Sequence, residues 1–174
     1  MKNPSHSSDS CIILGVDPGT RISGYGVICI QNQTYILLDY GCIRPPPGLK
    51  LSERYLVIFD SISELIEKHQ PSALVVETQY VHKNVQSALK LGMARGAVMI
   101  AGKKRGLSIF EYAPTVAKRA VVGHGRASKY QVQKMVQCLL KLSSPPQPED
   151  AADALALAIC HAHSAPHLQA GSEV

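Results

Sequence analysis

The sequence predicts an α/β protein built on a mixed five-stranded sheet that carries helices on both faces. Two observations support this prediction. The chain up to residue 43 contains three apolar runs typical of β-strands. From residue 49 onward, runs of helical period alternate with short runs typical of buried strands. With 174 residues, of which 45% are hydrophobic, the chain is long and apolar enough for one folded domain.

The first three strands are expected to form an antiparallel meander. Residues 12–17 and 24–31 are predicted strands joined by the tight turn PGTRISG, and residues 34–43 form the third. The run RPPPG then interrupts regular structure, because proline lacks the N–H group that helices and strands use. The sequence therefore predicts three neighbouring strands before the first helix.

Helices and strands alternate in the rest of the chain. Helical period predicts helices over residues 49–68 and 84–101. The runs at 72–78 and 107–112 are predicted to be short strands. Three helices are expected to complete the fold, at residues 114–121, 129–142 and 150–162. Ser128 is placed to cap the second of these.

The folded domain is expected to span residues 11–163, between a flexible leader (1–10) and a flexible tail (164–174). The leader lacks the apolar stretch of a signal peptide, and no apolar run approaches the roughly 20 residues that span a bilayer. We therefore expect a cytoplasmic protein. The five cysteines form no CxxC pair, which favours buried, reduced thiols. The histidines of HAHSAPH (161–167) indicate either a metal site or a helix end that frays into the tail.

Basic residues are concentrated in one part of the chain. Residues 78–148 contain twelve Lys and Arg residues and one acid, Glu111, which gives this segment a net charge of +11. The rest of the chain has six bases and twelve acids, so its net charge is −6. This asymmetry favours a polyanionic partner. Nucleic acid fits better than a membrane, because no basic amphipathic helix carries a bulky apolar face.

Four acids lie where the predicted fold can bring them together. Asp17 ends the first strand, Glu77 ends the fourth, and Asp150 and Asp153 share one face of the last helix. If the first and fourth strands are neighbours and the last helix crosses their ends, four carboxylates converge. Their charges repel one another unless cations neutralise them, and Mg²⁺ prefers oxygen ligands. Two such ions can activate water and stabilise a leaving oxygen, which predicts a metal-dependent nuclease.

Each of these motifs has a second interpretation. DPGT (17–20) could be a simple turn, or the phosphate loop of an actin-like ATPase, although that fold needs two domains and a longer chain. Asp150 and Asp153 could simply favour the dipole at a helix N-terminus. The small residues Ala88, Gly92 and Gly96 could serve either close packing within the fold or a helix-pair dimer interface.

Four long segments resemble the RuvC family of Holliday-junction resolvases, which have the ribonuclease H-like fold. They are LGVDPGTRISGYGVI, LVVETQYVHKNVQSALKLGMARGAV, FEYAPTVAKRAVVGHGRASKYQVQKMV and PEDAADALALAICHAH, and the resemblance covers residues 12–163. It implies that the catalytic, metal-binding acids are Asp17, Glu77, Asp150 and Asp153. It also implies that the small-residue helix, with Ala88, Gly92 and Gly96, forms a dimer interface.

The resemblance further implies DNA contacts. Tyr80 corresponds to the aromatic residue that stacks on an unpaired base at the crossover. Lys118 and Lys129 correspond to lysines that contact the DNA backbone. Lys83 and Arg126 are expected to face the DNA as well.

The implied activity is that of a homodimer that binds a four-way junction and nicks two strands of like polarity. One or two Mg²⁺ ions act in each site, Mn²⁺ can substitute, and the ends left are 5′-phosphate and 3′-hydroxyl. The implied partner in recombination and repair is a branch-migration helicase complex of the RuvA and RuvB type. Two alternatives stay open: a junction-binding scaffold without catalysis, and another ribonuclease H-like nuclease that acts on RNA.

Overall fold

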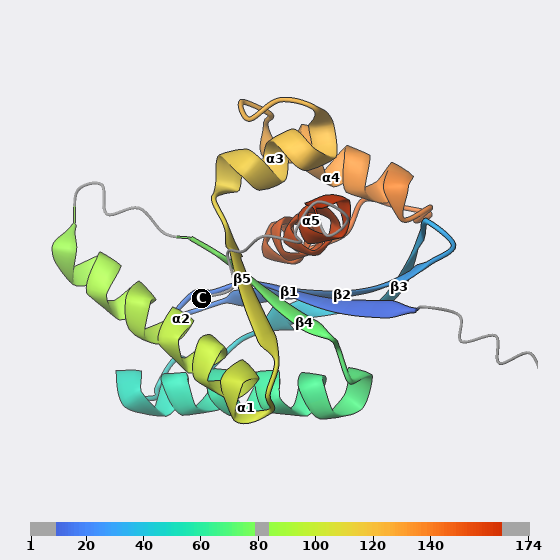
Figure 1. Cartoon of the computed structure of the whole chain (residues 1–174). Coiled ribbons are helices and arrows are strands. Elements are labelled where there is room, and N and C mark those ends of the chain that lie inside the picture. The colour runs from blue at the N-terminus through green and yellow to red at the C-terminus, as the bar shows by residue number, and fades with distance from the viewer. Residues whose placement is uncertain (1–9, 79–83, 165–174) are drawn as a thin grey trace, which may run out of the picture.

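The computed structural model describes residues 10–78 and 84–164 of the chain (Figure 1). The strands are β1 (Cys11–Asp17), β2 (Ser23–Gln31), β3 (Thr34–Ile43), β4 (Ala73–Glu77) and β5 (Ser108–Tyr112). The helices are α1 (Leu51–His69), α2 (Val85–Lys104), α3 (Pro114–Val122), α4 (Lys129–Leu139) and α5 (Glu149–Ser164). The five-stranded mixed sheet is therefore confirmed. The leader (1–10) and tail (164–174) lie almost wholly outside the described residues and stay predictions.

The sheet has the strand order β3-β2-β1-β4-β5. β1, β2 and β3 form the predicted antiparallel meander, and β4 and β5 continue the sheet parallel to β1. As predicted, the first and fourth strands are neighbours, with Val16 opposite Val76. The carboxyl ends of β1 and β4 therefore lie at the same edge of the sheet.

Helices cover both faces of the sheet (Figure 1). α1 and α2 pack on one face, where Leu14 and Val16 of β1 enter the core. α3, α4 and α5 lie on the other face, which receives Ile13. α5 runs between the sheet and the two other helices, and eleven of its residues are buried. This central position explains why the helix is rich in alanine and leucine.

The element bounds agree with the predictions to within a few residues, with two differences at helix ends. α2 continues to Lys104, three residues past the predicted end. α4 ends at Leu139 rather than at residue 142, because Lys141 has a φ of +53°, which a right-handed helix cannot contain. α4 does begin at the predicted cap, where the Ser128 hydroxyl accepts a hydrogen bond from the Gln131 N–H at 3.2 Å.

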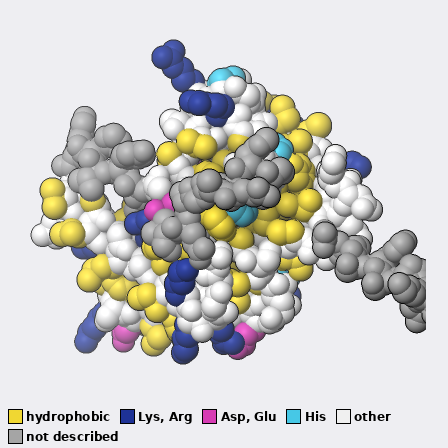
Figure 2. Space-filling view, viewed as in Figure 1, with side chains coloured by type: hydrophobic (Ala, Val, Ile, Leu, Met, Phe, Trp, Pro, Cys, Tyr) yellow, Lys and Arg dark blue, Asp and Glu magenta, His cyan; other side chains and the backbone are white. Residues whose placement is uncertain are grey.

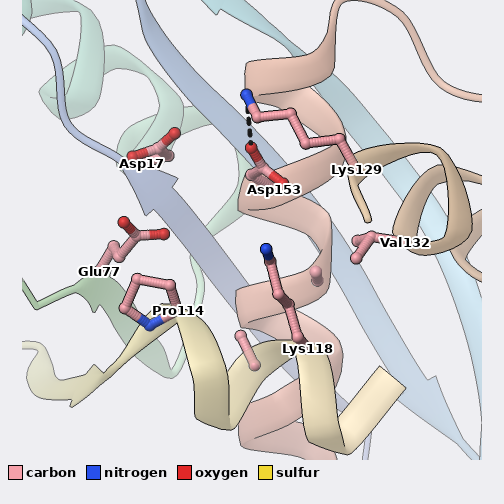
Figure 3. Close-up of a pocket in the computed structure, with 9 residues that line it drawn as sticks. Asp17, Glu77, Pro114, Lys118, Lys129, Val132 and Asp153 are labelled. Carbon is pink, nitrogen blue, oxygen red and sulfur yellow. Dashed lines mark ion pairs between the residues drawn. The ribbon is translucent and has the colours of Figure 1, made fainter. Parts of the chain in front are cut away.

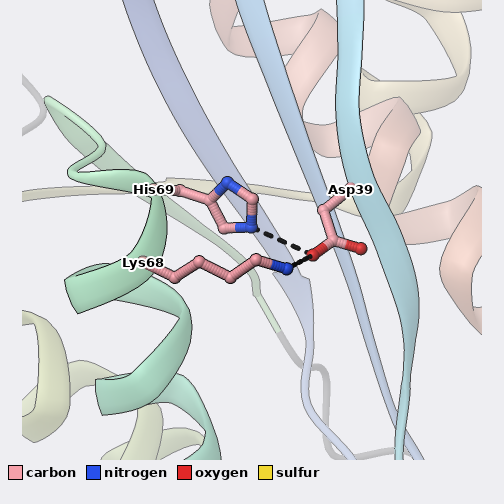
Figure 4. A network of polar contacts seen from close by, with 3 residues as sticks. All are labelled: Asp39, Lys68 and His69. Atoms are coloured by element: carbon pink, nitrogen blue, oxygen red, sulfur yellow. Dashed lines mark hydrogen bonds and ion pairs between the residues drawn. The ribbon is translucent and has the colours of Figure 1, made fainter.

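The last turn of α1 is tied to β3 by a polar network (Figure 4). Asp39 Oδ2 lies 2.7 Å from Lys68 Nζ and 3.0 Å from His69 Nε2. Burial raises the pKa of Asp39, but the hydrogen bonds from Lys68 and His69 outweigh it and lower the pKa overall. The network thus holds the edge strand against the helix.

Two predictions about single residue types are corrected. All five cysteines are free, as expected, but only Cys160 is buried, and Cys138 is exposed on the outer side of α4. His161 does not fray: it is buried, 3.0 Å from the Tyr112 hydroxyl, and burial lowers its pKa to about 4. Among the residues that the structure describes, none of the helices is both long and apolar enough to cross a membrane.

Candidate active site

Three acidic side chains face one space at the edge of the sheet (Figure 3). Asp17 and Glu77 come from the adjacent carboxyl ends of β1 and β4, and Asp153 comes from the first turns of α5. Lys118 of α3 and Lys129 of α4 approach the same space from the helical layer. Elements far apart in the sequence thus build a single charged site.

Glycines in β1 and β2 let α5 lie directly on the sheet. A Cβ atom added to Gly24 would stand 1.9 Å from the carbonyl oxygen of Asp150, and one added to Gly15 would stand 2.2 Å from that of Ala154. Both distances are far shorter than any real contact, so only glycine allows the helix to approach this closely. This close approach sets the position of the acids in the first turns of α5.

The space between these side chains is a cavity of about 230 Å³. Its charged lining consists of Asp17, Glu77, Asp153, Lys118 and Lys129, and its apolar lining of Pro114, Ala117, Val132 and Ala156. Buried apolar walls lower the local dielectric constant and strengthen the interactions between the charges.

Burial and mutual repulsion raise the pKa values of these acids. Burial, followed by the charges of Glu77, Asp153 and Asp150, raises the pKa of Asp17 to about 8. Burial and the charge of Asp153 raise the pKa of Glu77 to about 7, although Lys118 and Lys129 act against this. The site therefore favours either bound protons or bound cations.

Lys129 is the cation nearest to the acids of α5. Its Nζ lies 3.3 Å from Glu149 Oε2 and 3.6 Å from Asp153 Oδ2. Burial lowers the pKa of Lys129, but Asp153, Glu149 and Asp150 outweigh it and raise the pKa overall. Sequence reasoning missed Glu149, although its place beside Asp150 at the helix start was a usable signal.

The structure brings three of the four predicted acids together. Asp150 does not line the cavity, although its charge contributes to the raised pKa of Asp17. Side chains three residues apart on a helix differ in direction by roughly 60°, so the rotation of α5 over the sheet decides that Asp153, and not Asp150, lines the cavity. Among the described residues, no three or more His, Cys, Asp or Glu side chains are grouped closely enough to hold a metal ion.

The predicted DNA-contacting residues are only partly described. Lys118 and Lys129 line the cavity, whereas Arg126 is exposed in the loop between α3 and α4. Tyr80 and Lys83 lie outside the described residues.

The predicted dimer face of α2 is an exposed apolar surface. A Cβ atom added to Gly92 or Gly96 would meet nothing within 4 Å, so close packing within the described chain does not explain these glycines. Val85, Leu89 and Met93 are 66%, 64% and 61% exposed. With Ala88 and Gly92, these three side chains line a shallow apolar hollow. Figure 2 shows hydrophobic side chains on the surface over α2.

Comparisons with known proteins agree with this architecture. A family model described as crossover junction endodeoxyribonuclease RuvC matches residues 13–161. The protein of that description from Protochlamydia amoebophila is 71% identical over 155 residues, which are 89% of this chain and 92% of the relative. The one from Chlamydia felis is 51% identical over 156 residues, 88% of this chain and 93% of the relative.

Solved structures give the same result. The Thermus thermophilus RuvC structure superposes with a TM-score of 0.83 at 33% identity, covering 90% of this chain and 96% of that one. T. thermophilus RuvC in complex with Holliday junction substrate superposes with a TM-score of 0.82 at 31% identity, with the same coverage. These likenesses confirm the predicted ribonuclease H-like fold. Because the family model spans almost the whole described fold and the relatives match over nearly their full length, this chain belongs to the RuvC family of crossover junction endodeoxyribonucleases.

Proposed function

We propose that this protein resolves four-way DNA junctions in recombination and repair by nicking two strands of like polarity. The observation that carries the proposal is the cavity lined by Asp17, Glu77 and Asp153 at the sheet edge of a RuvC-family fold. A relative of the same fold, 31% identical, is described in complex with a Holliday junction substrate, which supports the choice of DNA. The ends left by each nick are a 5′-phosphate and a 3′-hydroxyl.

Mg²⁺ fits the chemistry of the site. Asp17, Glu77 and Asp153, with Asp150 close by, offer the oxygen ligands that this ion prefers, and their raised pKa values mean that a cation would relieve repulsion. One or two ions would supply Lewis acidity and activated water, and Mn²⁺ can take the same ligands.

The protein's own side chains hold the DNA. The ammonium groups of Lys118 and Lys129 border the acids, so they can bind phosphates next to the scissile one. Arg126 is exposed on the adjacent loop and extends this surface. Tyr80 and Lys83 follow β4, close in sequence to Glu77, which supports roles in base stacking and backbone contact at the crossover.

A two-fold dimer through α2 is the proposed assembly. The exposed side chains of Val85, Leu89 and Met93 surround glycines that allow a second helix to approach closely. Two-fold symmetry would match that of the junction and place one cavity on each of two strands. Membership of the family supports a branch-migration complex of the RuvA and RuvB type as partner and a cytoplasmic location.

A nicking assay tests the proposed activity. The full chain is incubated with a synthetic mobile four-way junction, linear duplex and an RNA–DNA hybrid, each with Mg²⁺ or EDTA. Paired, Mg²⁺-dependent nicks on the junction alone are expected. Cutting of the RNA–DNA hybrid instead would indicate a nuclease that acts on RNA. Tight binding to the junction without cutting in Mg²⁺ or Mn²⁺ would indicate a junction-binding scaffold without catalysis.

Gly24→Ala is expected to impair nicking more than folding. The added methyl group would overlap the Asp150 backbone, so the first turn of α5 must move away from β2. Displacement of reacting groups by about 1 Å costs roughly 100-fold in rate, whereas such overpacking costs about 1–3 kcal/mol of stability. Nicking rates and thermal unfolding measure the two effects. Gly41→Ala is the matched control, because the atoms nearest to its added Cβ are Tyr25 side-chain atoms at 3.0 Å or more, and not backbone. Equal nicking rates for both variants would show that the close approach of α5 to Gly24 does not position the catalytic acids.

The protein is expected to lose stability as pH rises in EDTA. The folded-state pKa values of Asp17 and Glu77, about 8 and about 7, lie above their usual values of 3.8 and 4.5. The folded state therefore keeps protons that the unfolded chain releases. The free energy of unfolding falls through this range, by at most about 1.4 kcal/mol per pH unit for each group. Thermal unfolding between pH 5 and 8, for the wild type and Asp17→Asn, measures this.

The Asp17→Asn variant should show a flatter pH dependence, and Mg²⁺ should restore more stability to the wild type than to the variant at pH 8. A constant difference between the two proteins across this pH range would show that Asp17 is not the titrating group.

A further inference from the structure

A second group of basic side chains lies near the catalytic acids but away from α3 and α4. Arg21, Arg44 and Arg54 line a pocket of about 430 Å³ together with Pro45, Pro46 and Pro47. No acidic side chain lines it. These arginines belong to the part of the chain whose net charge is −6, so the charge pattern along the sequence conceals them.

The strand register places this pocket at the same end of the sheet as the acids. Asp17 of β1 is opposite Gly24 of β2, which is opposite Cys42 of β3. Neighbouring strands are about 4.8 Å apart, so Cys42 lies roughly 10 Å from Asp17 along this row. Arg44 follows two residues after Cys42, and Arg21 lies in the turn that joins β1 to β2.

The electrostatics of Cys42 link the two regions. Burial, and then the charges of Asp150 and Asp17, raise the pKa of this thiol, while Arg44 acts in the opposite direction. Cys42 is therefore within electrostatic reach of both the acids and the arginine. Cys42 and Arg44 also line one shared cavity between β3 and α1, so the two residues lie close together.

The arginines differ in what they are free to bind. Arg54 donates from Nε to the Leu49 carbonyl oxygen at 3.0 Å and also donates to the Pro47 carbonyl, which fixes the proline-rich loop. Arg21 and Arg44 are exposed, and no hydrogen bond or ion pair joins either of them to another described residue. The site thus combines a pre-formed loop with two free guanidinium groups, which match phosphate geometry well.

We infer that Arg21 and Arg44, on the loop held by Arg54, bind the backbone phosphates of the DNA strand as it passes away from the catalytic acids. The inference rests on the proposed function and adds a contact surface to it. At about 3.4 Å of rise per nucleotide, the 10 Å row corresponds to roughly three nucleotides. Lys118 and Lys129 would then hold the strand on one side of the scissile phosphate and the arginines on the other.

DNA explains this position better than an acidic protein segment does. The pocket lies at the same end of the sheet as the acids, which repel an acidic peptide as well as a nucleic acid. Of the two, only a DNA strand that is cut at the acids must also pass along the neighbouring surface. The arginines offset that repulsion where the strand leaves the cavity.

A double-mutant cycle between protein and DNA tests the inference. The nick sites are first mapped with the wild type, and single neutral methylphosphonates are then placed one to five nucleotides on either side. Junction affinity and its salt dependence are measured for the wild type, Arg44→Gln and Arg21→Gln. Arg105→Gln is the matched control, because Arg105 pairs with Glu67 and precedes β5 at the opposite end of the sheet.

Each arginine variant should reduce the slope of log affinity against log salt by roughly 0.9, the value of one phosphate contact, and the control should not change it. One methylphosphonate position should weaken wild-type binding but have no further effect on Arg44→Gln. Slopes equal to the wild type, or fully additive effects at every position, would overturn the inference. Because the wild type is scored for nicking in the same experiment, failure of the proposed function would be seen separately.

Discussion

Asp17→Asn is expected to abolish nicking of the four-way junction while leaving junction binding nearly unchanged. Asp17 supplies the central carboxylate of the cavity, where burial and the other acids raise its pKa to about 8. Loss of a group that only orients metal ligands costs 10- to 100-fold, so loss of Asp17, which we propose as a ligand, should cost at least about 100-fold. Single-turnover nicking rates and equilibrium binding to the same junction measure the two quantities.

The substitution should not harm the fold. Asparagine is nearly the same size as aspartate, and it removes a negative charge from a repulsive cluster, so the variant should unfold at a higher temperature at pH 8 in EDTA. Asp60→Asn on the exposed side of α1 removes the same charge away from the site and should behave like the wild type. If Asp17→Asn nicked the junction at the wild-type rate, the chemistry would take place at another site.

The double substitution Leu89→Lys and Met93→Lys is expected to yield a folded monomer that has lost paired nicking. Both side chains are more than 60% exposed on α2, so lysine is tolerated in the isolated chain. In a dimer, the new charges would be buried against their symmetry copies, at a cost of several kcal/mol. Sedimentation measures the mass of the assembly and so shows whether the variant is a monomer. The fraction of junctions nicked on both strands measures the coupling between the two nicks, and we expect this fraction to fall by roughly 100-fold.

Ile36→Lys is the matched control for this prediction. Ile36 is 40% exposed on β3, at the edge of the sheet farthest from β5 and α2. This variant should remain dimeric and nick both strands. A dimeric Leu89→Lys/Met93→Lys protein would exclude the apolar face of α2 as the interface, and a monomer that still nicks in pairs would separate catalysis from dimerisation.

The arrangement of the acids was partly accessible from sequence. Asp17 and Glu77 could be placed because each ends an apolar run, and parallel neighbours bring their ends to one edge. The separation of Asp150 from Asp153 could not be predicted, because it depends on how α5 rotates over Gly24 and Gly15. A helical period states which residues share a face, but not how that face is turned toward the sheet.

The sequence by itself determined the element types, their order and the residues that end each strand, because these follow from local periodicity and turn chemistry. Only the tertiary structure decided that Lys129 lies between Glu149 and Asp153, that Gly92 and Gly96 face outward, and that Arg21 and Arg44 line one pocket. Each of these juxtapositions joins residues from different elements or depends on which face of a helix is left uncovered. Contacts of that kind are set by the packing of helices on the sheet, which local sequence patterns do not encode.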